Sequence, residues 1–120
     1  MARRPEMEKE IQLLHERICA ALGDPTRILI LYLLDEKDLC VNEISAALGL
    51  PQSSISRHLR ILRERHLVST SRQGTLIQYS LKDRRIIQAL DLLRSILAAQ
   101  LQDEMQVAKS IQTTYPRSSK

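Results

Sequence analysis

The residues of this chain that could recognise a polyanion are concentrated between Leu50 and Thr75. This stretch holds five arginines and one acidic residue, so its formal charge of +4 equals the net charge of the whole chain. Arginine neutralises phosphate groups, and a basic surplus confined to one segment is typical of a surface that binds nucleic acid. The alternative is a charged helix face that contacts only water. The five residues are Arg57, Arg60, Arg63, Arg65 and Arg72.

A helix is predicted from Gln52 to His66, with one apolar and one polar face. The apolar face repeats at spacings of three and four residues, and it consists of Ile55, Leu59, Leu62 and His66. The opposite face begins with short hydroxyl and amide side chains and continues with arginines, which can hydrogen-bond base edges and phosphates in the major groove. We therefore predict DNA contact. The predicted DNA-binding residues, one of them beyond the helix, are Gln52, Ser53, Ser54, Ser56, Arg57, His58, Arg60, Arg63 and Arg72.

The segments on either side of this helix predict how it is held. A short amphipathic helix is expected over Val41–Leu48, and Gly49 stops it, so the two helices form a helix-turn-helix unit. Period-two apolar spacing between Val68 and Leu81 predicts a β-hairpin with its tip at residues 72–75. A hairpin directly after a recognition helix is a wing. The predicted fold class is mainly α-helical with a β-hairpin wing, a winged helix-turn-helix.

The first and last helices are predicted to join two copies of the chain. A narrow apolar stripe runs from Met7 to Leu22 and ends before Gly23, and Asp83 can cap a long final helix with a stripe from Ile86 to Ala108. These stripes exceed what one small domain buries easily, so we expect a homodimer that places two recognition helices about 34 Å apart. The alternative is packing of both stripes within a monomer. We predict one domain over residues 1–112 and a disordered tail over residues 113–120.

Composition argues against several protein classes. The chain has 120 residues and no run of about 18 apolar residues, the length of a membrane-spanning helix. Its first ten residues lack the hydrophobic region of a signal peptide. No nucleophile, base and orienting group recur together, and no glycine-rich phosphate loop is present, so we do not expect an enzyme. Two cysteines do not make a disulfide framework. We expect a cytoplasmic protein with no membrane partner.

The order of these elements from Ile18 to Leu101 resembles the ArsR/SmtB family of winged-helix repressors. The most specific parts of the resemblance are the helix start at Gly23–Arg27, the stretch Ser56–Leu59, and the wing with Gly74 at its tip and Tyr79 behind it. The resemblance implies a dimeric transcriptional repressor that binds double-stranded operator DNA and leaves it when an inducer binds. A regulator without an inducer, or a module that uses the basic face to bind an acidic protein, remains as an alternative.

Two inducer sites that the resemblance suggests are missing from this sequence. Family members that sense arsenite have a Cys-Val-Cys-x-x-Cys motif, whereas here the corresponding residues are Cys40, Asn42 and Ser45. Other members bind zinc or related ions through histidines and carboxylates on the last helix, but residues 82–112 contain no histidine. Neither site can form as it does in those members.

A sparser set of ligands leaves several sensing hypotheses open. Cys40 with Glu43, and His15 with Cys19 one helical turn apart, could complete a tetrahedral metal site across two subunits. Cys19 and Cys40 could instead respond as thiols to arsenic(III), an organometalloid, a divalent soft metal ion, an oxidant or a persulfide. Both cysteines could also be ordinary packing residues. No other cofactor is expected.

Overall fold

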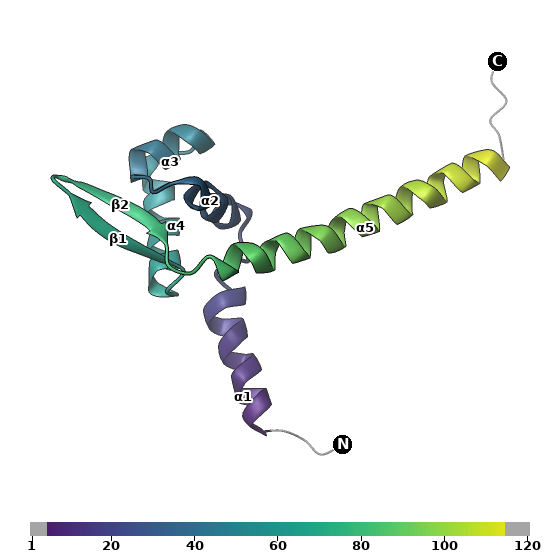
Figure 1. Cartoon of the computed structure of the whole chain (residues 1–120), viewed down its shortest axis with the longest axis horizontal. Helices are drawn as coiled ribbons and strands as arrows, with labels where there is room; N and C mark the ends of the chain where they lie inside the picture. Colours follow the sequence, from purple (N-terminus) through teal and green to yellow (C-terminus); the bar gives the residue numbers. More distant parts are fainter. Residues whose placement is uncertain (1–4, 115–120) are drawn as a thin grey trace. The chain divides into compact units, whose positions relative to one another are not determined.

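The computed structural model describes residues 5–114 and the side chains of residues 5–112. The chain divides into two units, Met1–Arg84 and Arg85–Lys120, and the prediction of a single domain over residues 1–112 stays a prediction. Figure 1 labels the helices and strands of both units. No helix in the described part of the chain is long and apolar enough to cross a membrane. The first unit contains α1 Pro5–Leu14, the π-helical segment η1 His15–Cys19, α2 Pro25–Glu36, α3 Val41–Leu48, α4 Gln52–Glu64, β1 Val68–Gln73 and β2 Leu76–Leu81.

The predicted first helix is not one continuous α-helix. The α-helical geometry of α1 ends at Leu14, and η1 continues as a π-helix in which the Ala20 N–H donates to the His15 carbonyl five residues earlier at 2.8 Å. The expected first helix therefore changes from α to π geometry after Leu14 and ends at Cys19, before Leu22. The apolar stripe expected on the first helix is exposed to solvent in α1, where Met7 and Ile11 are 53% and 52% exposed.

The start of α2 has a side-chain cap and an early proline. The Asp24 carboxylate accepts a hydrogen bond from the Thr26 N–H at 2.8 Å, and Pro25 occupies the first turn. An Asp cap and an early proline both favour helix initiation at this point. The inner side of α2 contacts α4 and β2. Together these elements bury an aliphatic core that includes Ile30, Leu31, Leu34, Leu39, Ile44, Ile55, Leu59, Leu62, Leu67 and Val68.

The predicted helix-turn-helix is confirmed at α3 and α4. Gly49 ends α3 in the left-handed conformation, with φ of 66°, and its N–H donates to the Ser45 carbonyl at 2.8 Å. The Ser45 hydroxyl donates to the Leu50 carbonyl and closes the turn. Pro51 then precedes the first residue of α4. The turn thus holds α4 against α3, and the two helices pack together in the core.

Replacement of Gly49 by alanine is expected to lower the free energy of unfolding by about 1–2 kcal/mol, because a Cβ is disfavoured at positive φ. The new methyl group meets no atom within 4 Å, so steric clash makes no contribution to the loss of stability. Urea denaturation of Gly49→Ala measures the loss. Gly49→Asn is the matched control, since asparagine tolerates this conformation better. Equal losses in the two variants would show that backbone conformation is not the cause.

The predicted hairpin wing is also confirmed. β1 pairs antiparallel with β2, with Gln73 opposite Leu76, so Gly74 and Thr75 form a two-residue turn. The base of the wing is tied to the rest of the first unit, because Leu39 and Tyr79 exchange backbone hydrogen bonds of 3.1 and 2.8 Å. Figure 1 shows the hairpin beside α4, with its tip projecting from the helices of that unit. The fold of this unit is therefore the expected winged helix-turn-helix.

The second unit consists of the predicted long final helix, α5, which spans Arg85–Thr114. Its first two turns bury Ile86, Ile87 and Leu90, whereas all its described side chains from Asp91 to Gln112 are exposed. The helix includes the first two residues of the predicted disordered tail, and residues 115–120 of that tail lie outside the described part. The large apolar side chains exposed on α5 are Leu92, Leu93, Ile96, Leu97, Leu101, Met105, Val107 and Ile111.

Candidate nucleic-acid interface

The outer face of α4 carries most of the predicted DNA-binding residues. The inner face of the helix consists of Ile55, His58, Leu59 and Leu62, all of them buried. Ser54 is half-buried at the edge between the two faces. Because the first unit holds α4 by its inner side only, the whole outer face is available to a ligand. The exposed polar residues on that face are Gln52, Ser53, Ser56, Arg57, Arg60 and Arg63, together with the acidic Glu64.

The N-terminus of α4 has no side-chain cap. Pro51 occupies the cap position, and its carbonyl accepts from the N–H groups of Ser54 and Ile55 at 3.1 Å each. No side chain at the cap position accepts a hydrogen bond from the first N–H groups of α4. The amino end of a helix carries a partial positive charge and favours anions. This end of α4 therefore combines donors, exposed hydroxyl groups and nearby Arg57, a combination suited to a phosphate backbone.

His58 does not lie on the outer face, so its assignment as a DNA-binding residue is corrected. Its side chain is 5% exposed, and its Nδ1 atom lies 3.2 Å from Nη1 of Arg27. At about 100° per residue, position 58 lies within about 60° of Ile55 and Leu62 on the wheel, a spacing that places it on the apolar side. Helical spacing alone could have located His58, whereas its residue type suggested a phosphate contact.

The prediction that His66 completes the apolar face of this helix is wrong. The helix ends at Glu64, and His66 follows with φ of 63° and an exposed side chain. The next residue, Leu67, turns inward instead and is 7% exposed. The Leu67 N–H donates to the Leu62 carbonyl at 2.9 Å, which fixes the exit from the helix into β1.

Burial lowers the pKa of His58 below its ordinary value of 6.5, and the charges of Arg27 and Arg57 lower the pKa further, whereas Asp24 opposes the change. Asp24 and Arg27 lie at the start of α2, whereas Arg57 precedes His58 on α4 and is exposed on its outer face. The unfolded chain therefore takes up a proton at His58 at a pH where the folded chain does not. Above pH 6.5, neutral His58 therefore makes its full contribution to the free energy of unfolding. This contribution is lost as the pH falls from 6.5 through the pKa of His58 in the folded chain, which lies below 6.5.

The free energy of unfolding is therefore expected to fall more between about pH 7.5 and pH 5 in the wild type than in His58→Gln, which has no titrating ring. Urea denaturation at both pH values measures this difference. An identical pH response in wild type and His58→Gln contradicts the assignment of the buried histidine.

The wing presents a second basic group. Arg72 lies on β1 opposite Ile77, and its side chain is exposed next to the two-residue turn at Gly74. Gly74 has φ of 65°, the conformation that lets the strands reverse direction with so short a connection. A basic side chain at a projecting hairpin tip is well placed to reach a groove or phosphate beside the one that α4 would occupy.

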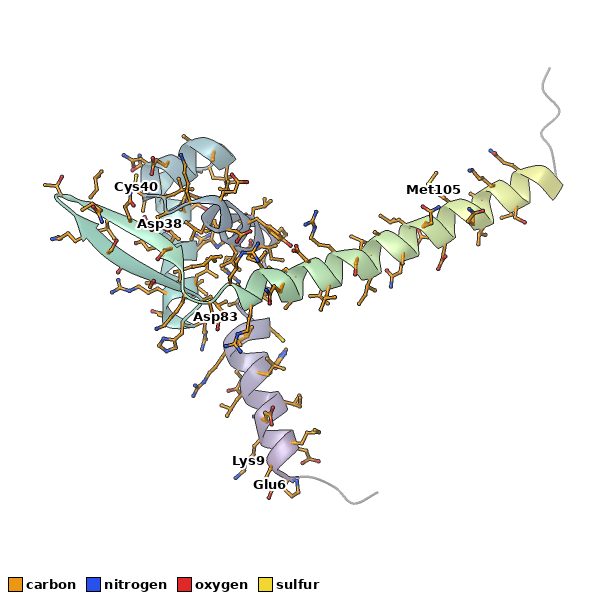
Figure 2. The ribbon with its side chains drawn as sticks, viewed as in Figure 1. Glu6, Lys9, Asp38, Cys40, Asp83 and Met105 are labelled. Atoms are coloured by element: carbon orange, nitrogen blue, oxygen red, sulfur yellow. The ribbon has the colours of Figure 1, made fainter. Side chains whose placement is uncertain are left out.

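The candidate sensing residues lie in two places in the first unit. Cys19 is exposed at the end of η1, the segment that also contains His15, whereas Cys40 is buried. Figure 2 labels Cys40 at the start of α3. The Glu43 carboxylate accepts a hydrogen bond from the Cys40 N–H at 2.9 Å, and this bond lowers the pKa of Glu43. Among residues 5–112, no group of three or more His, Cys, Asp or Glu side chains could hold a metal ion.

A helix-turn-helix whose second helix leads into a β-hairpin defines the winged-helix class of proteins. Within this class, residues 24–70 match the family model described as "Bacterial regulatory protein, arsR family". The chain is 36% identical over 93 residues to the HTH-type transcriptional regulator CmtR of Mycobacterium bovis, an alignment that covers 78% of this chain and 79% of CmtR. The chain therefore belongs to the ArsR family, as its resemblance implied.

Two further similarities agree with this membership. The chain is 38% identical over 68 residues to the "Transcriptional repressor SmtB homolog" of Synechocystis, covering 57% of this chain and 52% of that protein. The chain thus spans about half the length of that relative. The crystal structure of NolR from Sinorhizobium fredii superimposes with a TM-score of 0.71 at 32% identity, over 80% of this chain and 95% of NolR. CmtR and the SmtB homolog are transcription regulators by name, and membership of the same family confirms the expectation that the chain is not an enzyme.

Proposed function

We propose that this protein is a sequence-specific DNA-binding repressor of transcription. The observation that carries the proposal is the division of α4 into a buried, mainly aliphatic face and an exposed face on which glutamine, serine and arginine predominate. Short polar side chains near the start of the helix allow close approach to base edges, and Arg57 can bind a guanine in bidentate fashion. Arg60 and Arg63 follow one turn apart, where they would hold phosphates. The same proposal places the protein in the cytoplasm, where a bacterial chromosome lies.

The exposed apolar residues support a homodimer built from α1 and α5. Met7, Ile11 and Leu14 are 43–53% exposed on α1, and α5 exposes apolar side chains along most of its length. Exposed apolar side chains repeated along a helix in this way are typical of a subunit interface. A two-fold dimer would place two copies of α4 about 34 Å apart, one turn of the DNA helix. Sedimentation at micromolar concentration tests this part, and particles of 13.8 kDa alone would contradict it.

Selection of duplexes from a random-sequence pool tests the DNA-binding proposal without knowledge of the operator. We expect the wild-type protein to enrich a two-fold symmetric sequence whose half-sites are centred about 10 base pairs apart. A variant in which Arg57 and Arg60 are alanine should enrich none. Enrichment of no sequence by the wild type would contradict the proposal and favour the alternative in which the basic face binds an acidic protein.

We further propose that the repressor is released by a thiol-reactive inducer at Cys19 and Cys40. Cys40 directly follows Leu39, whose backbone pairs with Tyr79 on the second strand of the wing. A bond formed at the Cys40 sulfur would therefore disturb the backbone that anchors the wing. Candidate inducers are arsenic(III), an organometalloid, a divalent soft metal ion, an oxidant and a persulfide. A metal site with His15 and Glu43 would require ligands from two subunits.

Titration of the DNA complex with arsenite, zinc, cadmium and a persulfide donor tests the inducer proposal. Cys19→Ser and Cys40→Ser are suitable variants, because serine is an effective helix cap and preserves the start of α3 in place of Cys40. We expect at least one compound to release wild-type protein and none to release the double serine variant. Equal release of both proteins would remove the thiols from the mechanism. Release of neither would favour a regulator without an inducer.

A further inference from the structure

The side chain of Arg27 connects three segments of the first unit. From the first turns of α2, its Nε donates to the Ala21 carbonyl at 2.6 Å and its Nη2 donates to the Ala20 carbonyl at 3.4 Å. Its Nη1 lies 3.2 Å from Nδ1 of His58 on α4. One guanidinium group therefore joins the turn that follows η1 to the helix that carries the predicted DNA-binding residues.

The contact between Arg27 and His58 has a defined polarity. A guanidinium group only donates hydrogen bonds, so His58 must accept through Nδ1 and carry its proton on Nε2. The ring is 5% exposed, among aliphatic side chains of the inner face of α4. A directional hydrogen bond within an otherwise aliphatic interface favours one rotation of the helix, whereas leucine and isoleucine contacts tolerate small rotations. His58 also directly follows Arg57, so rotation at His58 changes where Arg57 points.

The other end of this connection lies in an unusual backbone. Ala20 directly follows η1, and its N–H donates to the carbonyl of His15, five residues earlier, instead of to the carbonyl four residues earlier. A single π-helical turn within a helix is rare and is often found at functional sites. A change of η1 to α-helical geometry would move the Ala20 and Ala21 carbonyls, and these carbonyls hold the guanidinium of Arg27 in place.

We propose that Arg27 and His58 are positioning residues that transmit the backbone state of η1 to the rotation of α4, and thereby set the affinity for specific DNA. The inference rests on the proposed DNA-binding function and adds a route by which events near Cys19 reach the interface. Neither residue needs to touch DNA. Loss of the hydrogen bond should impair base recognition more than general attraction to phosphates, because only base contacts depend on the exact direction of the side chains.

A double-mutant cycle tests this connection. Arg27→Met keeps the aliphatic stem and removes the donors, and His58→Leu removes the acceptor. Binding is measured with a selected duplex of about 30 base pairs, long enough for two half-sites, and with a shuffled duplex of the same length. Each single variant is expected to bind the selected duplex about tenfold more weakly and the shuffled duplex unchanged. The double variant should lose no more than either single variant, and His58→Gln, which keeps an acceptor, should recover most of the affinity.

The η1 end of the connection is tested by deletion of Glu16, which removes the extra residue of the π-helical turn. The deletion should weaken specific binding in the wild type and have no further effect in His58→Leu. The proposal would be overturned if the affinity losses of Arg27→Met and His58→Leu multiply in the double variant, or if each variant loses equal affinity for both duplexes. It would also be overturned if the Glu16 deletion weakens binding equally in the wild type and in His58→Leu. If the wild type binds no duplex, the proposed function fails and the connection to DNA fails with it. Circular dichroism ensures that every variant compared is folded.

Discussion

Arg57→Ala is expected to weaken binding to the selected duplex by about 10- to 100-fold, because a bidentate contact between arginine and guanine contributes about 1–3 kcal/mol. Arg57 is exposed on the outer face of α4 and lies one turn after Ser53, close to the amino end that enters the groove in this class of protein. Fluorescence anisotropy with labelled duplex measures the loss. The same variant should relax sequence preference at one position of each half-site.

Arg65→Ala is the matched control for this prediction, because it removes the same charge from the same stretch. Arg65 follows the last residue of α4, at the opposite end from the predicted base contacts. We expect its effect to be limited to the weaker, nonspecific attraction of one charge for DNA. If both variants lose affinity equally, net charge alone explains binding and α4 is not the recognition helix.

Leu59→Ala is expected to have the largest effect on stability, a loss of about 2–5 kcal/mol in the free energy of unfolding. Leu59 is fully buried at the centre of the inner face of α4, so its truncation leaves a cavity between this helix and the core. Urea denaturation at a fixed protein concentration measures the loss, because the stability of a dimer depends on concentration.

Leu76→Ala removes the same side chain from the wing, where Leu76 is 52% exposed. Its expected effect on stability is within about 0.5 kcal/mol, as is usual for exposed positions. A loss below about 1 kcal/mol for Leu59→Ala would mean that α4 is held by contacts other than those of its inner face.

Local sequence signals were sufficient to predict the elements that position the interface. Gly49 is needed where the chain takes a positive φ, Asp24 and Pro25 favour a helix start, and the alternation before and after Gly74 matches a two-residue hairpin. Each of these features depends on a few neighbouring residues. The same is true of the exposed side chains of α4, whose direction follows from helical periodicity once the buried face is known.

The errors of the sequence-based prediction arose where residue type and position disagreed. His58 lies at an apolar position on the wheel, but its partner Arg27 is 31 residues away in the sequence and could not be identified from spacing. The π-helical turn had a weak signal, since Leu14, Ile18 and Leu22 follow one another at intervals of four, longer than the roughly 3.6 residues of an α-helical turn. An α-helix with a slightly drifting stripe fits those intervals nearly as well.

The candidate sensing residues were the least predictable part of the protein. Cys40 and Glu43 are close in sequence, and the structure gives their pairing a structural role, because the carboxylate caps the first turn of α3. Cys19 lies on a different element, and the arrangement of the two cysteines in the proposed dimer would depend on how the two copies contact each other. Sequence spacing within one chain contains no information about that arrangement.

The salt dependence of DNA binding tests the central claim most directly. For the wild type, the logarithm of the affinity for the selected duplex should fall linearly with the logarithm of the salt concentration. In Arg60→Gln and Arg63→Gln, the slope should become shallower by about one for each phosphate that the variant no longer neutralises. Affinity that does not change with salt, or slopes that are the same in all three proteins, would contradict the assignment of the outer face of α4 as the DNA-binding surface.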